Sequence, residues 1–402
     1  MKRVVVAGAG LAGHEVVRRL LADPEFDGTI TWHAGEPGHP YNRVLLTDLL
    51  AGRHAPSAIE LPTLNDPRLT YRNTQLRSIA KAEFDYLVLA TGAEPVIPPV
   101  RGNAVALRTL ADARTILAEI GIDRDAGRAH IGRGVFAGLG SRRHSVPGCV
   151  AVVGGGPLGV EAACALASRG LRVELLHRGP HLLSRWLDAE SAALLGGSLA
   201  QAGIVVRCDI DVSAATGGTW PSADLVILAC GVRPRVALAR SAGLPVDRGI
   251  LVDTSGRSLG DERIFAIGDC AEAVDRPAGA LAALDDARRA AASILGSSPL
   301  PAAAAPLRLR TYGVPGADVA VLGRPRAEAA IQFIQFTDQR RRTRKVLALD
   351  GDVPVAAALV GDVGAAAALA QAIARPSAPA PRVPAALLTS GAGRGAGGFG
   401  SA

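Results

Sequence analysis

The sequence has few aromatic residues, no long apolar run and no paired cysteines. Its five cysteines lie far apart, without a CxxC pair or a spacing typical of a metal site. This distribution favours a reducing compartment, so we expect a cytoplasmic protein in which most cysteines are buried as small hydrophobic residues. The apolar run before Gly8 is too short for a signal peptide, and no later run suits a membrane span. We therefore expect a soluble chain with no metal site and no membrane partner.

The positive charge is not accompanied by a recognisable nucleic-acid module. Lysine and arginine total 44 against 37 acidic residues, which gives a formal net charge of +7. We attribute this charge to an arginine-rich background or to an acidic protein partner, and we expect no nucleic acid. At 402 residues the chain exceeds the size of one hydrophobic core, which predicts at least two domains.

Two segments have the same expected order of secondary-structure elements. Residues 3–7, "RVVVA", read as a strand, glycines follow at once, "HEVVRRLLAD" has helical spacing and "GTITWHAGEP" reads as a strand. The same order recurs in "CVAVVGGG", "GVEAACALASRG" and "RVELLHRG". A strand, a glycine turn, a helix and a strand are the context in which GxGxxG is typical of a dinucleotide site. The glycines concerned are Gly8, Gly10 and Gly13 in the first unit and Gly154, Gly156 and Gly159 in the second.

In such a unit one glycine permits the tight turn, one lets the backbone approach a pyrophosphate, and one brings the helix against the strand. The pyrophosphate then lies at the positive N-terminus of the helix. Two units predict two dinucleotides, and the useful pair is a nicotinamide that delivers hydride to a flavin. A duplicated unit with one inactive site is the alternative.

Five motifs occur in order along the chain: "GAGLAG", "LATGAEP", "GGGPLGVEAA", "LACGVRPR" and "RIFAIGDCAE". On these motifs residues 1–370 resemble the two-dinucleotide flavoprotein reductases, the pyridine nucleotide-disulfide oxidoreductase superfamily. "GEPGHPYNRVLLTDLLAGR" most resembles the reductase region of the nitrite reductase large subunit and the electron-transfer subunit of assimilatory nitrate reductase.

The resemblance implies an α/β fold with two Rossmann-like domains, in which the NAD(P)H domain is inserted in the FAD domain, and a small C-terminal α+β domain. The expected limits are 1–115 and 241–298 for the FAD domain, 116–240 for the NAD(P)H domain with an arginine-rich insertion at about 121–148, 306–374 for the small domain and 375–402 for a disordered tail.

The resemblance also implies roles for single residues. Asp269 would hold the ribityl hydroxyls of FAD, and Arg43 would lie near its pyrophosphate, unless Arg43 is an ordinary exposed arginine. Glu161 would face the nicotinamide, unless it is an ordinary acid of a first helical turn. The full FAD set is Gly8, Gly10, Leu11, Ala12, Gly13, Glu36, Arg43, Thr91, Gly92, Gly268 and Asp269, and the NAD(P)H set is Gly154, Gly156, Leu158, Gly159, Glu161, His177, Arg178 and Gly231.

Three departures from the family pattern bear on these roles. The acid that binds the FAD ribose would align with Gly35, so Glu36 or a water must serve. Asp48 replaces a lysine of many relatives, which favours the nitrite reductase branch over the ferredoxin reductases. The strand after the second glycine motif ends in His177 and Arg178 without a carboxylate. Arg178 could accept a 2'-phosphate, whereas the nitrite reductase branch often has His there and uses NADH, so NADH and NADPH both stay open.

The resemblance implies a free-standing module that passes hydride from NAD(P)H to FAD and electrons to a separate redox protein, in nitrite or nitrate assimilation. The chemistry is centred on the flavin, so we expect no catalytic side chain and no metal. An NAD(P)H oxidase and a ferredoxin or rubredoxin reductase are the enzymatic alternatives. A non-enzymatic flavin-bound redox sensor and a DNA-associated protein that uses Arg133, Arg142 and Arg143 are the others. The sequence does not predict the oligomeric state.

Overall fold

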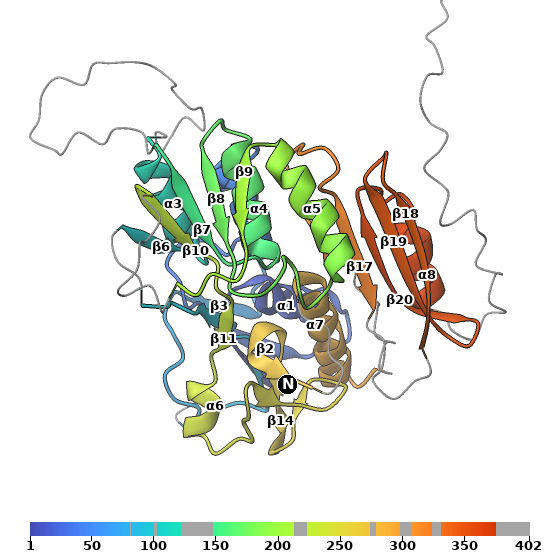
Figure 1. Ribbon diagram of the computed structural model, residues 1–402. Helices are drawn as coiled ribbons and strands as arrows, with labels where there is room; N and C mark the ends of the chain where they lie inside the picture. The colour runs from blue at the N-terminus through green and yellow to red at the C-terminus, as the bar shows by residue number, and fades with distance from the viewer. Residues whose placement is uncertain are drawn as a thin grey trace, which may run out of the picture. The chain divides into compact units, whose positions relative to one another are not determined.

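A computed structural model describes residues 1–80, 82–99, 103–121, 148–212, 223–273, 279–297, 307–323 and 331–374 (Figure 1). The chain divides into two compact units. The first holds Met1–Gly148 and Ala223–Ala303, and the second holds Cys149–Ser222 and Ala304–Ala402. Apart from Gly121 and Gly148, the expected arginine-rich insertion lies outside the described residues, as does the expected tail at 375–402.

The first unit is built on a six-stranded sheet with the order β13-β14-β4-β1-β2-β3. All neighbouring strands are parallel except β13, which is antiparallel to β14. Val4, Val5, Val6 and Ala7 are all buried, as expected for a central strand that is covered on both faces. The strands are β1 (Lys2–Ala7), β2 (Gly28–His33), β3 (Leu69–Arg72), β4 (Tyr86–Leu89), β13 (Arg257–Ser258) and β14 (Asp261–Ala266).

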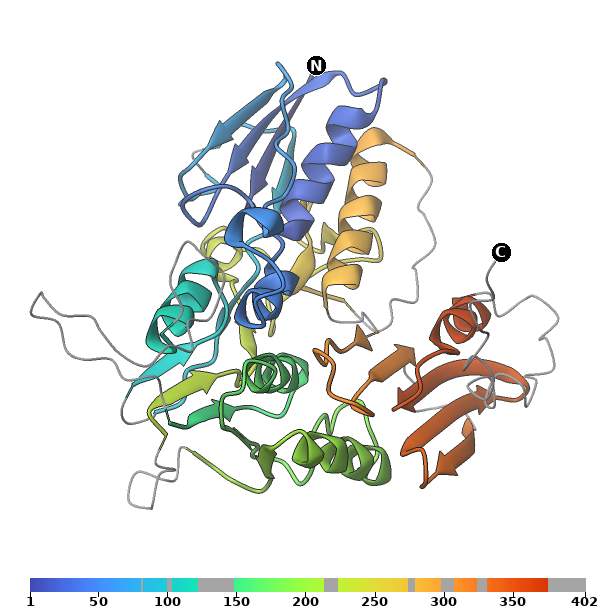
Figure 2. The ribbon, with the colours of Figure 1, turned by 90° about the horizontal axis from the view of Figure 1, so that it is seen from above.

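Two helices cover one face of this sheet. α1 (Leu11–Ala22) and α7 (Ala280–Leu295) lie side by side (Figure 2) and share one core cluster with β1, β2 and β14. α7 ends at Gly296, whose φ of +80° allows the left-handed cap that glycine favours.

Shorter elements complete the first unit. β5 (Ala93–Pro95) is antiparallel to β11 (Val232–Pro234), whereas β6 (Ala104–Ala106) is parallel to β10 (Leu225–Leu228) and β12 (Ile250–Leu251) is parallel to β15 (Ala271–Glu272). The helical segments are η1 (Arg43–Leu45), α2 (Leu46–Leu50), η2 (Pro56–Ile59), α3 (Leu110–Glu119), α6 (Ala237–Ser241) and η4 (Gly268–Cys270).

The second unit contains a parallel array of β7 (Val150–Val153), β8 (Val173–Leu176) and β9 (Ile204–Arg207). Every residue of β7 and β8 is buried. The helices that accompany these strands are α4 (Pro157–Ala167) and α5 (Ala189–Gln201). The parallel sheets of the two units confirm the expected α/β class, and the limits given above for the domains stay a prediction.

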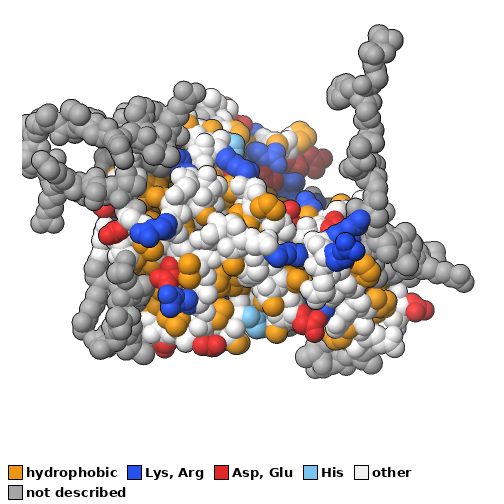
Figure 3. Space-filling view, turned by 45° about the horizontal axis from the view of Figure 1, so that its top comes forward, with side chains coloured by type: hydrophobic (Ala, Val, Ile, Leu, Met, Phe, Trp, Pro, Cys, Tyr) orange, Lys and Arg blue, Asp and Glu red, His pale blue; other side chains and the backbone are white. Residues whose placement is uncertain are grey.

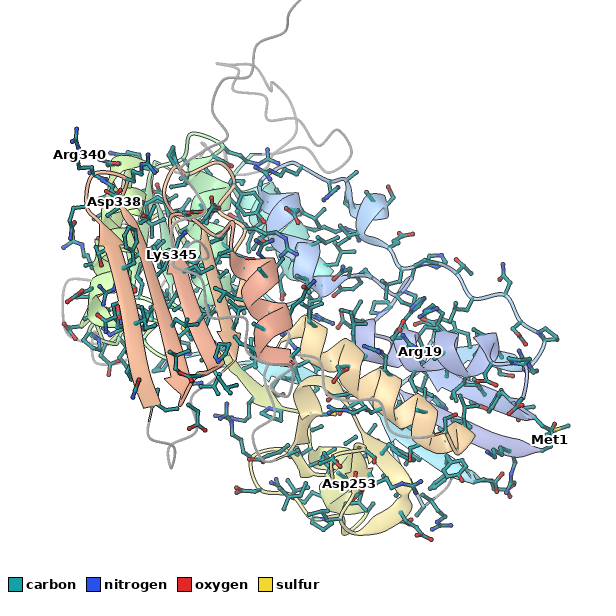
Figure 4. All side chains as sticks on the ribbon, turned by 90° about the vertical axis from the view of Figure 1, so that its right-hand side faces the viewer. Met1, Arg19, Asp253, Asp338, Arg340 and Lys345 are labelled. Atoms are coloured by element: carbon teal, nitrogen blue, oxygen red, sulfur yellow. The ribbon has the colours of Figure 1, made fainter. Side chains whose placement is uncertain are left out.

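An antiparallel sheet with the order β16-β17-β20-β19-β18 also belongs to the second unit. Figure 4 shows Asp338 and Arg340 at the turn between β18 and β19. Lys345 of β19 is buried and reaches Asp362 Oδ2 at 2.7 Å, because a buried charge needs a partner. The elements are β16 (Leu307–Arg308), β17 (Val319–Gly323), β18 (Ile331–Asp338), β19 (Thr343–Asp350), β20 (Val353–Val360) and α8 (Ala366–Ala374).

The charged side chains are distributed over the surface. On the face in Figure 3, Lys and Arg side chains lie in several separate groups, with Asp or Glu side chains near several of them. No helix in the described part of the chain combines the length and the apolar character that a membrane span requires.

Candidate functional site

The first glycine loop joins β1 to α1. Gly8 has a φ of +120°, and a Cβ at this position would lie 2.1 Å from the carbonyl oxygen of Ala90. A Cβ on Gly13 would lie 2.0 Å from the carbonyl oxygen of Gly8. Only glycine fits at both positions, because a side chain would collide with backbone atoms that cannot move away. The turn and the close seating of α1 therefore depend on these two residues.

The N-terminus of α1 is open. Gly10 is the N-cap, no side chain caps it, and the space where its Cβ would stand has no atom within 4 Å. Leu11 and Ala12 begin the first turn, and no acidic residue lies in it. The first N–H groups and the helix dipole present partial positive charge there, which suits a pyrophosphate.

Trp32 of β2 fixes this loop. Its buried indole Nε1 donates a hydrogen bond to the carbonyl oxygen of Gly8 at 3.0 Å, and its ring makes an edge contact with Tyr71. His14 of α1 contacts the carbonyl oxygen of Pro62 through Nε2 at 2.8 Å. The loop is thus tied to the neighbouring strand through an indole that does not titrate.

Glu36 lies just beyond β2 and is half-buried in a polar cluster. Its carboxylate accepts hydrogen bonds from Arg43 Nη2 and from the Tyr41 hydroxyl, both at 2.5 Å. Burial raises the pKa of Glu36, but the charge of Arg43 and these two hydrogen bonds outweigh it, and the pKa falls below its ordinary value. Burial and the contact with Glu36 raise the pKa of Tyr41 to about 12. Glu36 is therefore ionised at neutral pH.

Arg43 continues this cluster towards Asp269. Its Nη1 donates to the carbonyl oxygen of Arg108 at 2.5 Å, and Arg108 Nη2 lies 2.6 Å from Asp269 Oδ2. Arg108 Nε also donates to the carbonyl oxygen of Ala93 at 3.2 Å. The structure thus brings Glu36, Arg43 and Asp269 into one polar chain through Arg108.

Sequence reasoning missed Arg108. The signal available was its position directly before the capping box of α3, in which Thr109 and Asp112 bond to each other's backbone N–H groups. The backbone N–H of Arg108 itself donates to Asp112 Oδ2 at 3.0 Å, so the cap of α3 orients this arginine.

Gly268 begins η4 with a φ of +71°, and its N–H donates to Asp286 Oδ2 at 3.0 Å. A Cβ there would lie 3.3 Å from the Cβ of Ala12, so η4 approaches the first turn of α1. Cys270 is buried, and its Sγ donates to the carbonyl oxygen of Leu89 at 3.2 Å. These contacts give Cys270 a packing role.

Thr91 and Gly92 follow β4. Thr91 Oγ1 donates to the carbonyl oxygen of Arg235 at 2.8 Å, and Arg235 N donates to the carbonyl oxygen of Gly92 at 2.9 Å. Gly92 and Gly231 have φ values of +67° and +96°. Gly231 belongs to the first unit, whereas the other residues expected to bind NAD(P)H belong to the second.

The second glycine loop joins β7 to α4. Gly154 has a φ of +121°, which matches the +120° of Gly8. Gly156 is the N-cap of α4, Pro157 takes the first helical position, and no side chain caps this helix. The space where the Cβ of Gly156 would stand is open, while Gly159 is buried and Leu158 is half-buried.

His177 and Arg178 follow β8 with different environments. His177 Nδ1 accepts a hydrogen bond from Gly155 N at 3.1 Å, so the imidazole contacts the glycine loop. Arg178 is exposed, and within the described part of the chain no hydrogen bond or ion pair holds its guanidinium. Of these two residues, Arg178 is the one with a free charge.

Glu161 in α4 is buried and bonded. Its Oε1 accepts from Arg310 N at 3.0 Å, and its Oε2 lies 3.7 Å from Arg310 Nη1. Sequence reasoning missed Arg310, which lies 149 residues away along the chain.

Burial, together with the charge of Glu161, raises the pKa of Cys164 to about 12, so this cysteine stays a thiol at neutral pH. No cluster of three or more His, Cys, Asp or Glu side chains that could hold a metal ion was found among the described residues.

Comparison with known proteins gives one family. Residues 2–287 match the family described as pyridine nucleotide-disulphide oxidoreductase. The chain is 30% identical over 305 residues to a nitrite reductase [NAD(P)H] of Bacillus subtilis (strain 168), which covers 67% of this chain and 34% of that protein. It is 27% identical over 329 residues to the assimilatory nitrate reductase electron transfer subunit of the same organism. This match covers 73% of this chain and 39% of that protein. The chain thus spans about a third of the length of the first relative and about two fifths of the second.

Other similar proteins are covered along most of their length. A rhodocoxin reductase of Rhodococcus erythropolis is 30% identical over 334 residues, which covers 73% of this chain and 72% of that protein. The putidaredoxin reductase–putidaredoxin complex superposes with a TM-score of 0.77 and 24% identity, over 97% of this chain and 98% of that one. The latter likeness concerns the fold alone.

Proposed function

The chain belongs to the pyridine nucleotide-disulphide oxidoreductase family, and on that premise we propose that it is an FAD-dependent reductase that oxidises NADH or NADPH and passes electrons to a separate redox protein. The observation that carries this proposal is the pair of glycine loops, each followed by a helix whose glycine N-cap is open. Two such loops in one chain suit two dinucleotides.

The residues of the first unit fit FAD. The open N-terminus of α1, with Arg43 at hand, would hold the pyrophosphate, and the ionised Glu36 would hold the ribose. Asp269 would hold the ribityl hydroxyls, with Gly268 allowing close approach. Glu36, Arg43 and Asp269 already lie in one hydrogen-bonded chain, so little side-chain ordering is left for the binding step. Bound FAD would supply a hydride acceptor and a donor of single electrons.

The residues of the second unit fit a nicotinamide dinucleotide. The open N-terminus of α4 would hold its pyrophosphate, and Leu158 and Gly159 of the first turn would adjoin it. Arg178, exposed and unpaired among the described residues, supports NADPH, because a 2'-phosphate needs positive charge and β8 ends without a carboxylate.

The proposed acceptor is a nitrite or nitrate reductase. This choice rests on the two Bacillus subtilis relatives and on the segment at 35–53 that resembles them. A ferredoxin-like acceptor is the competing candidate, supported by the likeness to rhodocoxin reductase. An NADH oxidase of Methanocaldococcus jannaschii, 33% identical over 208 residues, supports oxygen as a third acceptor. The cytoplasmic location stays a prediction.

The test begins with the purified chain. We expect a yellow protein whose visible absorbance is bleached by NADPH or NADH without oxygen. Steady-state rates with oxygen, a ferredoxin, a rubredoxin and the partner nitrite or nitrate reductase then rank the acceptors. A colourless protein that takes up no FAD would overturn the flavoprotein assignment. Fast oxygen consumption with slow transfer to every protein acceptor would instead favour the oxidase.

A further inference from the structure

The imidazole of His177 lies between two glycines of the second unit. A Cβ on Gly155 would lie 2.6 Å from His177 Cγ, and a Cβ on Gly179 would lie 2.8 Å from His177 Nε2. A side chain at either position would displace the ring. The ring thus occupies the space beside the glycine loop. In other dinucleotide sites the residue at the end of this strand reaches outwards to bind the ribose, but the ring of His177 does not.

The hydrogen bond defines the protonation state of the ring. Gly155 N donates to His177 Nδ1 at 3.1 Å, so Nδ1 must carry a lone pair; in the neutral ring the proton then belongs to Nε2, a buried atom that has no hydrogen-bond partner among the described residues. The carbonyl oxygen of Gly155 accepts a hydrogen bond from Leu183 N at 2.8 Å. Gly155 is the residue between Gly154 and the N-cap Gly156, so both of its peptide groups are fixed in the middle of the loop.

Nearby groups favour the neutral ring. Burial lowers the pKa of His177, and the charges of His181 and Arg178 lower it further. The backbone of His181 and the charge of Asp209 act in the opposite direction, but the net pKa is below the ordinary value of histidine. At neutral pH the ring is therefore in the form that can accept from Gly155.

We propose that His177 is a positioning residue for the nicotinamide nucleotide, which it serves by holding the second glycine loop through its unprotonated Nδ1. This inference rests on the proposed function of that loop as the NAD(P)H site. Protonation would place an N–H group against the N–H of Gly155, so the loop would lose its support. The affinity for the nucleotide then falls as the pH drops through the pKa of His177, and the reading of the 2'-position is left to Arg178.

Two variants of His177 separate the effect of its hydrogen-bond acceptor from the effect of its protonation. His177→Asn keeps an acceptor oxygen near the place of Nδ1 but cannot titrate, so we expect near wild-type affinity at about pH 8 and no loss at about pH 5. His177→Leu removes the acceptor, so we expect binding weaker by about threefold to tenfold at both pH values. His181→Asn is the matched control, because it removes a neighbouring imidazole but leaves His177 in place. It should keep a loss of affinity in acid, with the midpoint moved to higher pH, since a charge that lowers the pKa of His177 is removed.

The measurement uses the FAD-loaded chain and calorimetric titration with NAD⁺ at both pH values. NADP⁺ is compared at about pH 8 alone, because its 2'-phosphate has a pKa of about 6 and would itself lose charge in acid. A second readout needs no nucleotide: nitrogen chemical shifts of labelled histidine, assigned through His177→Asn, should give an unprotonated Nδ1 at neutral pH. A protonated Nδ1 would overturn the inference. Equal affinities and equal pH profiles for wild type, His177→Asn and His177→Leu would also overturn it, while nucleotide binding itself persists. Wild-type protein that binds neither nucleotide would overturn the proposed function, and the inference with it.

Discussion

The two glycine loops share a backbone and differ in what holds them. Gly8 and Gly154 have nearly the same φ, and both helices start at an uncapped glycine. The first loop is held at a carbonyl oxygen, by the donor Trp32 Nε1, whereas the second is held at an N–H group, by the acceptor His177 Nδ1. An indole keeps its proton throughout the physiological range, but an imidazole does not. The contact that holds the first loop is therefore independent of pH, whereas the contact that holds the second loop depends on pH.

The surroundings of the loops differ as well. Beyond the first loop, charged groups pair with one another through Arg43 and Arg108. Beyond the second, Arg178 stays exposed. A paired site is ordered before its ligand arrives, whereas an exposed charge can select between ligands that differ by one phosphate.

The largest effect is expected at the closest backbone contact. Gly13→Ala puts a methyl group 2.0 Å from the carbonyl oxygen of Gly8, which we expect to destabilise the first unit by about 3 kcal/mol and to abolish FAD retention. Gly10→Ala is the control, since its Cβ meets no protein atom within 4 Å; compared without FAD, it should unfold much closer to the wild-type melting temperature than Gly13→Ala does. Thermal unfolding and flavin absorbance compare the two. Equal melting temperatures for both variants would contradict the steric argument.

Asp269→Ala should release FAD and leave a colourless protein. The substitution removes the proposed partner of the ribityl hydroxyls and also leaves Arg108 Nη2 without its carboxylate. The absorbance of the purified variant is the measurement, with Asp261→Ala as a control, because Asp261 pairs with Arg263 in β14. A fully yellow Asp269→Ala protein would refute the ribityl assignment.

Arg178→Glu tests the exposed charge of the second unit. We expect the ratio of kcat/KM for NADPH over NADH to fall by about tenfold or more, because a charge-assisted contact with the 2'-phosphate is replaced by repulsion. Arg172→Glu changes the same charge at the other end of β8 and should leave the ratio unchanged. If both variants keep the wild-type ratio, Arg178 does not read the 2'-position.

The smallest effect is expected at the indole. Trp32→Phe keeps an aromatic ring and removes the donor to Gly8, so FAD should bind about threefold to tenfold more weakly. The loss should be the same at about pH 8 and about pH 5, since neither the indole N–H nor the carbonyl oxygen that accepts its bond titrates. Fluorescence titration with FAD gives both values. A loss confined to acid would remove the contrast between the loops.

The local grammar of the chain predicted both strand–loop–helix–strand units, because apolar runs, glycine turns and helical spacing are short-range signals. The polar partners were not predictable in that way. Arg108 meets Asp269 across 161 residues, and Arg310 meets Glu161 across 149, so no local pattern could pair them. His177 was expected from its position at the strand end, but the direction of its ring depends on the space that Gly155 and Gly179 leave open.

The bond between Trp32 and Gly8 also gives the protein an optical probe. The chain has three tryptophans, and the indole N–H of Trp32 bonds to the first glycine loop. Indole emission shifts with hydrogen bonding, and a flavin nearby quenches it. Binding of FAD at the first loop should therefore lower the fluorescence of Trp32. The emission of the Trp32→Phe variant comes from the other tryptophans and is the background to subtract. Flavin occupancy could then be followed in real time, without labels and without turnover.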